Sequence, residues 1–179
     1  MRIALIGYGE VGRILAEDLR ERAHVLAAYD TRLAGDAGQA MREHAQLCGV
    51  TMAADHAEAV RGAELVISAV TASQAVAVAE AVAPGLTGGA FVLDLNSASP
   101  GAKVHACAVV HAALGRYVEG AVMTSVPPHR IKVPLLLGGP DAGALAPLLD
   151  ELGFAARIAS PALGVASATK MCRSVMIKG

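Results

Sequence analysis

Residues 2–12, with the sequence RIALIGYGEVG, decide the fold of this chain. Ile3–Ile6 is a short apolar run of the kind that forms a buried parallel strand. Gly7, Gly9 and Gly12 follow it in G-x-G-x-x-G spacing, and an amphipathic run begins directly after them. The stretch therefore predicts a strand, a tight glycine turn and the N-terminal end of a helix.

Each glycine of this turn has its own physical role. The first makes the tight turn, the second lets the backbone approach a pyrophosphate, and the third lets helix and strand pack closely. The helix N-terminus adds N–H groups and the positive end of a dipole, which both favour phosphate. We therefore predict a dinucleotide-binding turn rather than a purely structural one. Its expected cofactor-binding residues are Gly7, Tyr8, Gly9, Glu10, Val11 and Gly12.

A second apolar run, Val25–Tyr29, ends in an acidic residue, Asp30. Dinucleotide-binding folds place a carboxylate about 20 residues after the turn, where it accepts hydrogen bonds from the ribose of NAD. It also repels the 2′-phosphate of NADP, although Arg32, two residues further on, could pair with that phosphate instead. We expect Asp30, Thr31 and Arg32 to bind the cofactor, with NAD favoured and NADP as the alternative.

Apolar runs and helical patterns alternate along the rest of the chain. Helices are expected between further strands at 50–52, 64–70, 90–94, 117–123, 134–138 and 154–159. Alternation of this kind is typical of an α/β fold with a Rossmann-type, doubly wound and mainly parallel sheet. We expect one dinucleotide-binding domain over residues 1–160, because no internal boundary is evident before about Ser160.

Composition limits the possible partners. The chain has 179 residues, of which 17% are charged, and its formal net charge is −1. This balance argues against nucleic acid or a membrane surface as a partner, and no apolar run approaches the ~20 residues of a membrane span. The cysteines at positions 48, 107 and 172 are widely spaced and odd in number, which is typical of reduced, buried thiols in a cytoplasmic protein. The histidines form no pair at ligand spacing, so we expect no metal site.

The end of the chain, residues 161–179, is its most unusual part. Residues 163–178 are apolar over most of a helical circumference, which is the pattern of a buried helix. Nothing follows for this helix to pack against, so we interpret the chain as the front part of a longer protein. An exposed apolar face also favours self-association, and we expect a homo-oligomer, a dimer in the complete protein.

Three further segments have recognisable patterns: residues 94–100 read DLNSASP, residues 119–125 read EGAVMTS, and residues 164–174 read GVASATKMCRS. With the glycine turn, they resemble the β-hydroxyacid dehydrogenase family, which includes 3-hydroxyisobutyrate and 6-phosphogluconate dehydrogenases. The corresponding family patterns are D-x-S-T-x-x-P, D-A-P-V-S-G-G and G-x-G-x-x-x-K-x-x-N-N. The resemblance covers the whole chain. It implies NAD(P)-dependent oxidation of a small hydroxy acid. It also implies that residues 161–179 are the start of a long interdomain helix, which in the family leads into an all-helical C-terminal domain.

The resemblance also assigns roles to residues. Lys170 lies at the family's catalytic lysine, and a base is needed to take the hydroxyl proton when hydride leaves an alcohol. The alternative is a lysine at a helix edge that reaches solvent. Contacts to the cofactor are implied for Val70, Thr71 and Asn96, where a plain strand end or a helix cap is the alternative. The implied substrate-binding residues are Asn96, Ser97, Met123, Thr124, Ser125, Arg173 and Ser174.

Departures from the family patterns leave the substrate open. Met123–Ser125 replaces Ser-Gly-Gly, and Arg173 and Ser174 replace the paired asparagines. The sequence leaves two other functions open. An imine reductase relative would usually lack a lysine at the position of Lys170. A regulatory module that binds NAD(H) without chemistry would need neither Lys170 nor the Asn96–Ser97 pair.

Overall fold

One mixed sheet forms the centre of the computed structural model, which describes residues 1–178. Its strands are β1 (Arg2–Ile6), β2 (Val25–Tyr29), β3 (Val50–Met52), β4 (Leu65–Ser68), β5 (Phe91–Asp94), β6 (Arg116–Val122), β7 (Leu135–Gly138) and β8 (Ala156–Ser160). They form an eight-stranded sheet in the order β3-β2-β1-β4-β5-β6-β7-β8. Neighbouring strands pair in parallel from β3 to β6, and β7 joins β6 in antiparallel register.

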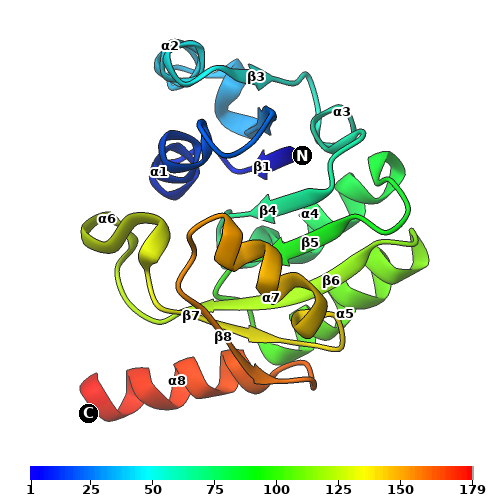
Figure 1. The fold of residues 1–179 in the computed structure, drawn as a ribbon, viewed down its shortest axis with the longest axis vertical. Helices are drawn as coiled ribbons and strands as arrows, with labels where there is room; N and C mark the ends of the chain where they lie inside the picture. Colours follow the sequence, from blue (N-terminus) through cyan, green and yellow to red (C-terminus); the bar gives the residue numbers. More distant parts are fainter. Residues whose placement is uncertain (179) are drawn as a thin grey trace.

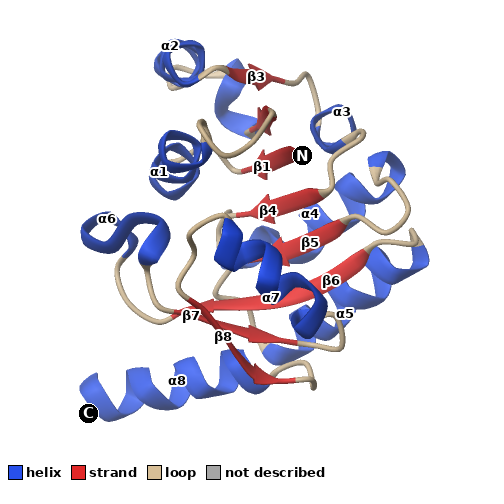
Figure 2. Ribbon diagram, viewed as in Figure 1, coloured by secondary structure: helices blue, strands red, loops and turns tan. Residues whose placement is uncertain are grey.

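Helices cover both faces of this sheet (Figures 1 and 2). They are α1 (Glu10–Leu19), α2 (Gly38–Cys48), α3 (His56–Val60), α4 (Ala75–Val82), α5 (Pro100–Ala112), α6 (Val126–His129), α7 (Ala142–Glu151) and α8 (Val165–Lys178). Short 3₁₀ turns occur at η1 (Thr31–Ala34), η2 (Ala72–Gln74), η3 (Ala83–Gly85) and η4 (Arg130–Lys132). One buried core lies under α1, α2 and α7, and a second under α3, α4 and α5. The prediction of a Rossmann-type, doubly wound and mainly parallel sheet is confirmed.

The strand order reverses between β1 and β4. The chain leaves β1 toward β2 on one side and returns to β4 on the other. The carboxyl ends of β1, β4 and β5 point the same way, toward the side where α1 and α6 lie (Figure 1). Open α/β sheets bind ligands in the crevice at such a reversal.

Two glycines of the first turn are required by packing. Gly7 has φ +92°, and a Cβ atom there would lie 2.3 Å from the carbonyl oxygen of Ala69. At Gly12, a Cβ would lie 2.2 Å from the carbonyl oxygen of Gly7. Real atoms cannot approach so closely, so the first and third glycines allow α1 and β4 to pack against the turn.

A buried carboxylate anchors α8. Glu119 of β6 is fully buried, and it accepts hydrogen bonds from the backbone N–H groups of Gly164 and Ser167, each at 2.7 Å. An acceptor with negative charge is favourable at a helix N-terminus, because the first N–H groups lack partners within the helix. The anchor fixes the direction in which α8 leaves the sheet.

The second half of α8 is exposed, although its apolar pattern predicted a buried helix. Met171, Val175, Met176 and Ile177 are all more than half exposed. Cys172 is exposed as well, so the expectation of a buried thiol is confirmed for Cys48 and Cys107 but is wrong for Cys172. The reason is geometric, because the helix continues past the edge of the sheet (Figure 1). Of the helices within residues 1–178, none is long and apolar enough to cross a bilayer.

Candidate cofactor and substrate site

Two adjoining clefts open at the carboxyl edge of the sheet, and Ala69 and Val70 line both. The first, which we call the α8 cleft, has a volume of about 810 Å³, and the second, the β2 cleft, about 370 Å³. The predicted residues that line the α8 cleft are Val11, Val70, Asn96, Ser97, Met123, Thr124, Ser125, Lys170, Arg173 and Ser174. Those that line the β2 cleft are Gly7, Gly9, Asp30, Thr31, Arg32, Val70 and Thr71.

The N-terminus of α1 lies between these clefts and suits a pyrophosphate. Gly9 is the N-cap residue, and no side chain caps the helix. The N–H groups of the first turn therefore lack the side-chain acceptor that usually satisfies them. An anionic ligand can accept from these groups and gains from the helix dipole.

Three predicted residues of the turn do not line either cleft: Tyr8, Glu10 and Gly12. The side chain of Tyr8 is fully buried, and its hydroxyl lies 3.0 Å from Nδ1 of His44. Its backbone N–H donates to Asp30 at 2.8 Å. Tyr8 therefore supports the turn from behind, and Gly12 contributes through packing.

Asp30 and Arg32 form a tight pair at the end of β2. The Arg32 Nε and a terminal guanidinium nitrogen donate to the two carboxylate oxygens of Asp30, at 2.9 and 2.8 Å. Backbone N–H groups of Arg32 and Tyr8 donate to the same carboxylate. Burial alone would raise the pKa of Asp30, but these hydrogen bonds outweigh it and leave the pKa lowered.

The two partners of this pair differ in exposure. The Asp30 carboxylate is only 7% exposed, whereas the Arg32 side chain is 57% exposed and crosses in front of Gly9. The acceptor sites of Asp30 are thus already occupied, and the outward-facing group at this end of the cleft is the guanidinium.

The β2 cleft also contains residues that the sequence did not single out. His56 and Gln74 line it beside Tyr29, and the His56 and Tyr29 rings lie 4.5 Å apart in an edge-on arrangement. Burial lowers the pKa of His56, so the neutral imidazole is favoured. No sequence signal marks His56, because it begins a short helix far along the chain from β2.

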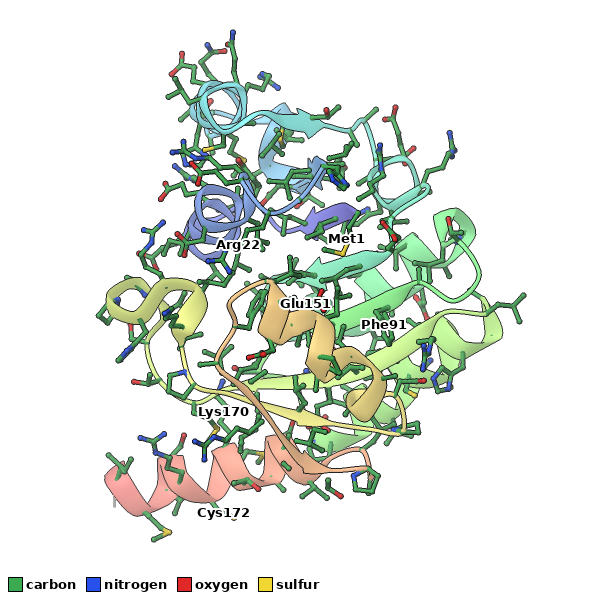
Figure 3. All side chains as sticks on the ribbon, viewed as in Figure 1. Met1, Arg22, Phe91, Glu151, Lys170 and Cys172 are labelled. Atoms are coloured by element: carbon green, nitrogen blue, oxygen red, sulfur yellow. The ribbon has the colours of Figure 1, made fainter. Side chains whose placement is uncertain are left out.

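Lys170 reaches from α8 to the segment that follows β5. Its Nζ donates to the Ser97 Oγ at 2.6 Å, and the side chain lies on the sheet-facing side of α8, with Cys172 on the other side (Figure 3). Burial lowers the pKa of Lys170, and the positive charge of Lys103 lowers it further. A neutral amine is thus easier to reach here than on an exposed lysine.

Asn96 lines the α8 cleft, but its amide group is used within the protein. Its Oδ1 accepts from the backbone N–H of Val70 at 2.6 Å, and its Nδ2 donates to the Ser68 Oγ at 2.9 Å. The side chain therefore links the ends of β4 and β5. Ser97, by contrast, is exposed and meets Lys170.

Arg173 lies one turn beyond Lys170 on α8 and spans to the loop after β6. It donates to the backbone carbonyl of Met123 at 2.8 Å. Lys170 and Arg173 are the two cations in the α8 cleft, and no carboxylate is among its described lining residues. The cleft therefore favours anions.

A distant ion pair fixes the loop that follows β6. Arg130 donates from Nε and a terminal guanidinium nitrogen to Oδ1 of Asp18 on α1, at 3.0 and 2.8 Å. The N–H of Ile131 donates to the same carboxylate. Arg130 has φ +55°, a backbone conformation that is uncommon outside glycine. The contact ties the loop on the substrate side to the helix that begins at the glycine turn.

Across the described part of the chain, no group of three or more histidine, cysteine, aspartate or glutamate side chains could hold a metal ion.

Comparisons with known proteins agree with this arrangement. The model of the NAD binding domain of 6-phosphogluconate dehydrogenase matches residues 2–153. A conserved hypothetical protein from Sinorhizobium meliloti 1021 is 40% identical in sequence, with a TM-score of 0.91 over 99% of this chain and 60% of that one. MTH1747, a conserved protein of unknown function described as structurally similar to 3-hydroxyacid dehydrogenases, is 28% identical, with a TM-score of 0.84 over 99% of this chain and 65% of that one.

An uncharacterized 28.5 kDa protein from Methanothermus fervidus is 26% identical over 178 residues, which are 99% of this chain and 66% of that protein. The chain thus spans less than two thirds of the length of each of these relatives. The family match confirms the resemblance drawn from the sequence and the prediction of an NAD-binding domain. This chain belongs to the family of NAD-binding domains of 6-phosphogluconate dehydrogenase.

Proposed function

We propose that this chain is the cofactor-binding part of an NAD(P)-dependent oxidoreductase that oxidises the hydroxyl group of a small hydroxy acid. Lys170 is the general acid/base in this proposal. The supporting observation is the contact of Lys170 with Ser97 in a cationic cleft that adjoins the glycine turn. The relatives are longer than this chain, and we propose this activity for the whole protein.

The residues present fit a dinucleotide. The uncapped first turn of α1 would hold the pyrophosphate, and the β2 cleft would hold the adenosine end. Val70, whose N–H is held by Asn96, would support the nicotinamide end at the boundary of the two clefts. A bound nicotinamide would supply the acceptor for the hydride of the substrate's carbinol carbon.

Lys170 supplies the acid–base chemistry. Its lowered pKa increases the fraction of neutral amine, which can take the proton of the substrate hydroxyl. In the reverse direction the ammonium group returns that proton. Ser97 holds the Nζ atom at the wall of the cleft, so the amine is oriented before substrate arrives.

The charge of the α8 cleft favours a hydroxy acid over the alternatives. Lys170 and Arg173 attract a carboxylate, and no described lining residue is acidic. An iminium substrate is cationic and would be repelled by the same two groups. A module that only senses NAD(H) has no use for the Lys170–Ser97 contact, which serves no cofactor subsite in this proposal.

The choice between NAD and NADP depends on the Asp30–Arg32 pair. A free Asp30 would favour NAD, but its acceptor sites are filled by Arg32 and Tyr8. The exposed guanidinium offers a partner for a 2′-phosphate, and it can also turn away to let Asp30 meet the ribose hydroxyls of NAD. We infer that the site accepts both cofactors.

The function is tested with a panel of small 2- and 3-hydroxy acids, each incubated with the full-length protein and either NAD or NADP. Neutral alcohols of the same size serve as controls for the charge requirement. In a parallel assay, cyclic imines are offered with reduced cofactor. Formation of reduced cofactor with hydroxy acids, and not with alcohols, supports the proposal. Turnover of imines alone contradicts it.

A further inference from the structure

Lys103 is a buried lysine in the first turn of α5, next to residues 94–97, which follow β5 and reach the α8 cleft. Its side chain is fully buried. Lysine is rarely placed in such a position unless it is paired, and a cation near a helix N-terminus is further disfavoured by the dipole. An apolar side chain would fill the same space at less cost, so the charge calls for an explanation.

The partners of Lys103 all belong to one carboxylate residue. Its Nζ donates to the backbone carbonyl of Asp94 at 2.9 Å and lies 3.1 Å from the Asp94 Oδ1. The Tyr117 hydroxyl donates to the other carboxylate oxygen at 2.6 Å, and the N–H of Asn96 donates to Oδ1 at 2.8 Å. Lys103 thus neutralises the carboxylate that fixes the start of the segment 94–97.

This segment meets both parts of the site. Asn96 holds the N–H of Val70 at the boundary of the two clefts. The next residue, Ser97, holds the amine of Lys170. A displacement of Asp94 would therefore move Asn96 and Ser97. Through these two residues it would displace the backbone of Val70 on the cofactor side and the amine of Lys170.

The charged and titratable groups around Lys103 come from three elements. Asp94 of β5 and the fully buried Glu119 of β6 are acidic, and Tyr117 of β6 stays neutral because burial raises its pKa. Lys170 of α8 is the other cation, and the positive charge of Lys103 lowers its pKa. Burial lowers the pKa of Lys103, and Asp94 opposes that shift. The contact of 3.1 Å with the carboxylate fits an ammonium–carboxylate pair.

We propose that Lys103 is a positioning residue for Lys170: by pairing with Asp94 it holds the Asp94–Ser97 segment in place, and through Ser97 it holds the Lys170 amine against that segment. The catalytic significance of this arrangement rests on the proposed function. The effect of Lys103 on the position of the Lys170 amine does not depend on that function.

The test measures the protonation of Lys170 directly. Competitive acylation with acetic anhydride over a pH series, read by mass spectrometry of the peptide that contains Lys170, gives its titration midpoint without turnover. Lys103→Met removes the charge but leaves Asp94 unpaired, so this variant is destabilised. Lys103→Met/Asp94→Asn removes both charges and keeps a hydrogen-bonding group for Tyr117 and Asn96. Lys132→Met, which removes an exposed lysine of η4, is the matched control.

The double variant removes a neutral ion pair, so a change at Lys170 reports the position of the segment. We expect the midpoint of Lys170 to rise by about 0.5–1 pH unit, because burial, which lowers its pKa, decreases when Ser97 no longer holds the amine. Lys103→Arg and Lys132→Met should leave it unchanged. An unchanged midpoint in the double variant, or an equal rise in Lys132→Met, overturns the proposal. If the midpoint rises but no variant or wild type turns over a hydroxy acid, the proposed function fails and the role of Lys103 stands.

Discussion

Replacement of Arg32 by alanine is predicted to shift cofactor preference toward NADH. In the wild type, the guanidinium neutralises Asp30 and is the outward-facing group at the ribose end of the β2 cleft. Arg32→Ala removes the phosphate partner and also leaves the Asp30 carboxylate unpaired. Both changes oppose a 2′-phosphate, and the second favours the ribose hydroxyls of NADH.

The magnitude follows from the contacts. A hydrogen bond to a charged group contributes about 1.5–3 kcal/mol, so loss of the arginine should weaken NADPH binding by roughly 10-fold to 150-fold. The pair with Asp30 is more than half exposed on the arginine side, so releasing it is worth about 1 kcal/mol or less. Binding of NADH should therefore improve by no more than about fivefold.

Calorimetric titration of NADH and NADPH measures both affinities. Arg42→Ala is the matched control, because Arg42 is an exposed cation on neighbouring α2 that donates to the carbonyl of Leu33 and lines neither cleft. Asp30→Asn should move the preference in the opposite direction, toward NADPH. A ratio of the two affinities that stays within twofold of wild type in Arg32→Ala would refute the reasoning.

Three further predictions concern the support of the site. Gly12→Ala places a Cβ at 2.2 Å from the carbonyl of Gly7, so we expect about 1–3 kcal/mol of destabilisation and weaker NADH binding; Gly143→Ala, in open space on α7, should show neither in urea unfolding and calorimetry. The lowered pKa of Asp30 means that its stabilising effect is lost as pH falls below its unfolded value of 3.8, and urea unfolding of Asp30→Asn should be less sensitive to acid there. Glu119→Gln keeps one acceptor for the N-terminus of α8 but loses its charge, so hydrogen exchange in α8 should become faster, and unchanged protection would count against the anchor.

The fold could be read from the sequence because its signals are local. The run Ile3–Ile6, the glycine spacing after it and Asp30 at the end of the next strand all lie within one β-α-β unit. Strands β1, β2, β4, β5 and β6 run in the same direction, so the residues that follow them lie at one edge of the sheet. The same topology explains why most of the predicted site residues line the two clefts.

Contacts between distant parts of the chain could not be predicted. Asp18 and Arg130 are separated by more than a hundred positions, and nothing in either local pattern indicates that they pair. The sequence alone indicates a surface position for Lys103, because lysine is rarely buried in a helix. Only the packing of α5 on the sheet shows that its side chain is buried. The role of Asn96 within the protein, rather than toward a ligand, likewise depends on where Val70 lies.

Steady-state kinetics of Lys170→Met test the central claim most directly. A general acid/base contributes about 10²–10⁴-fold to the rate, so kcat of the full-length protein with its best hydroxy acid should fall by that factor, while the Kd of NADH measured by calorimetry stays within twofold. Because the pKa of Lys170 is lowered, wild-type kcat/KM should also rise with pH through a midpoint below the ordinary lysine value of 10.5. A variant that keeps wild-type kcat, with the same pH profile, would contradict the account.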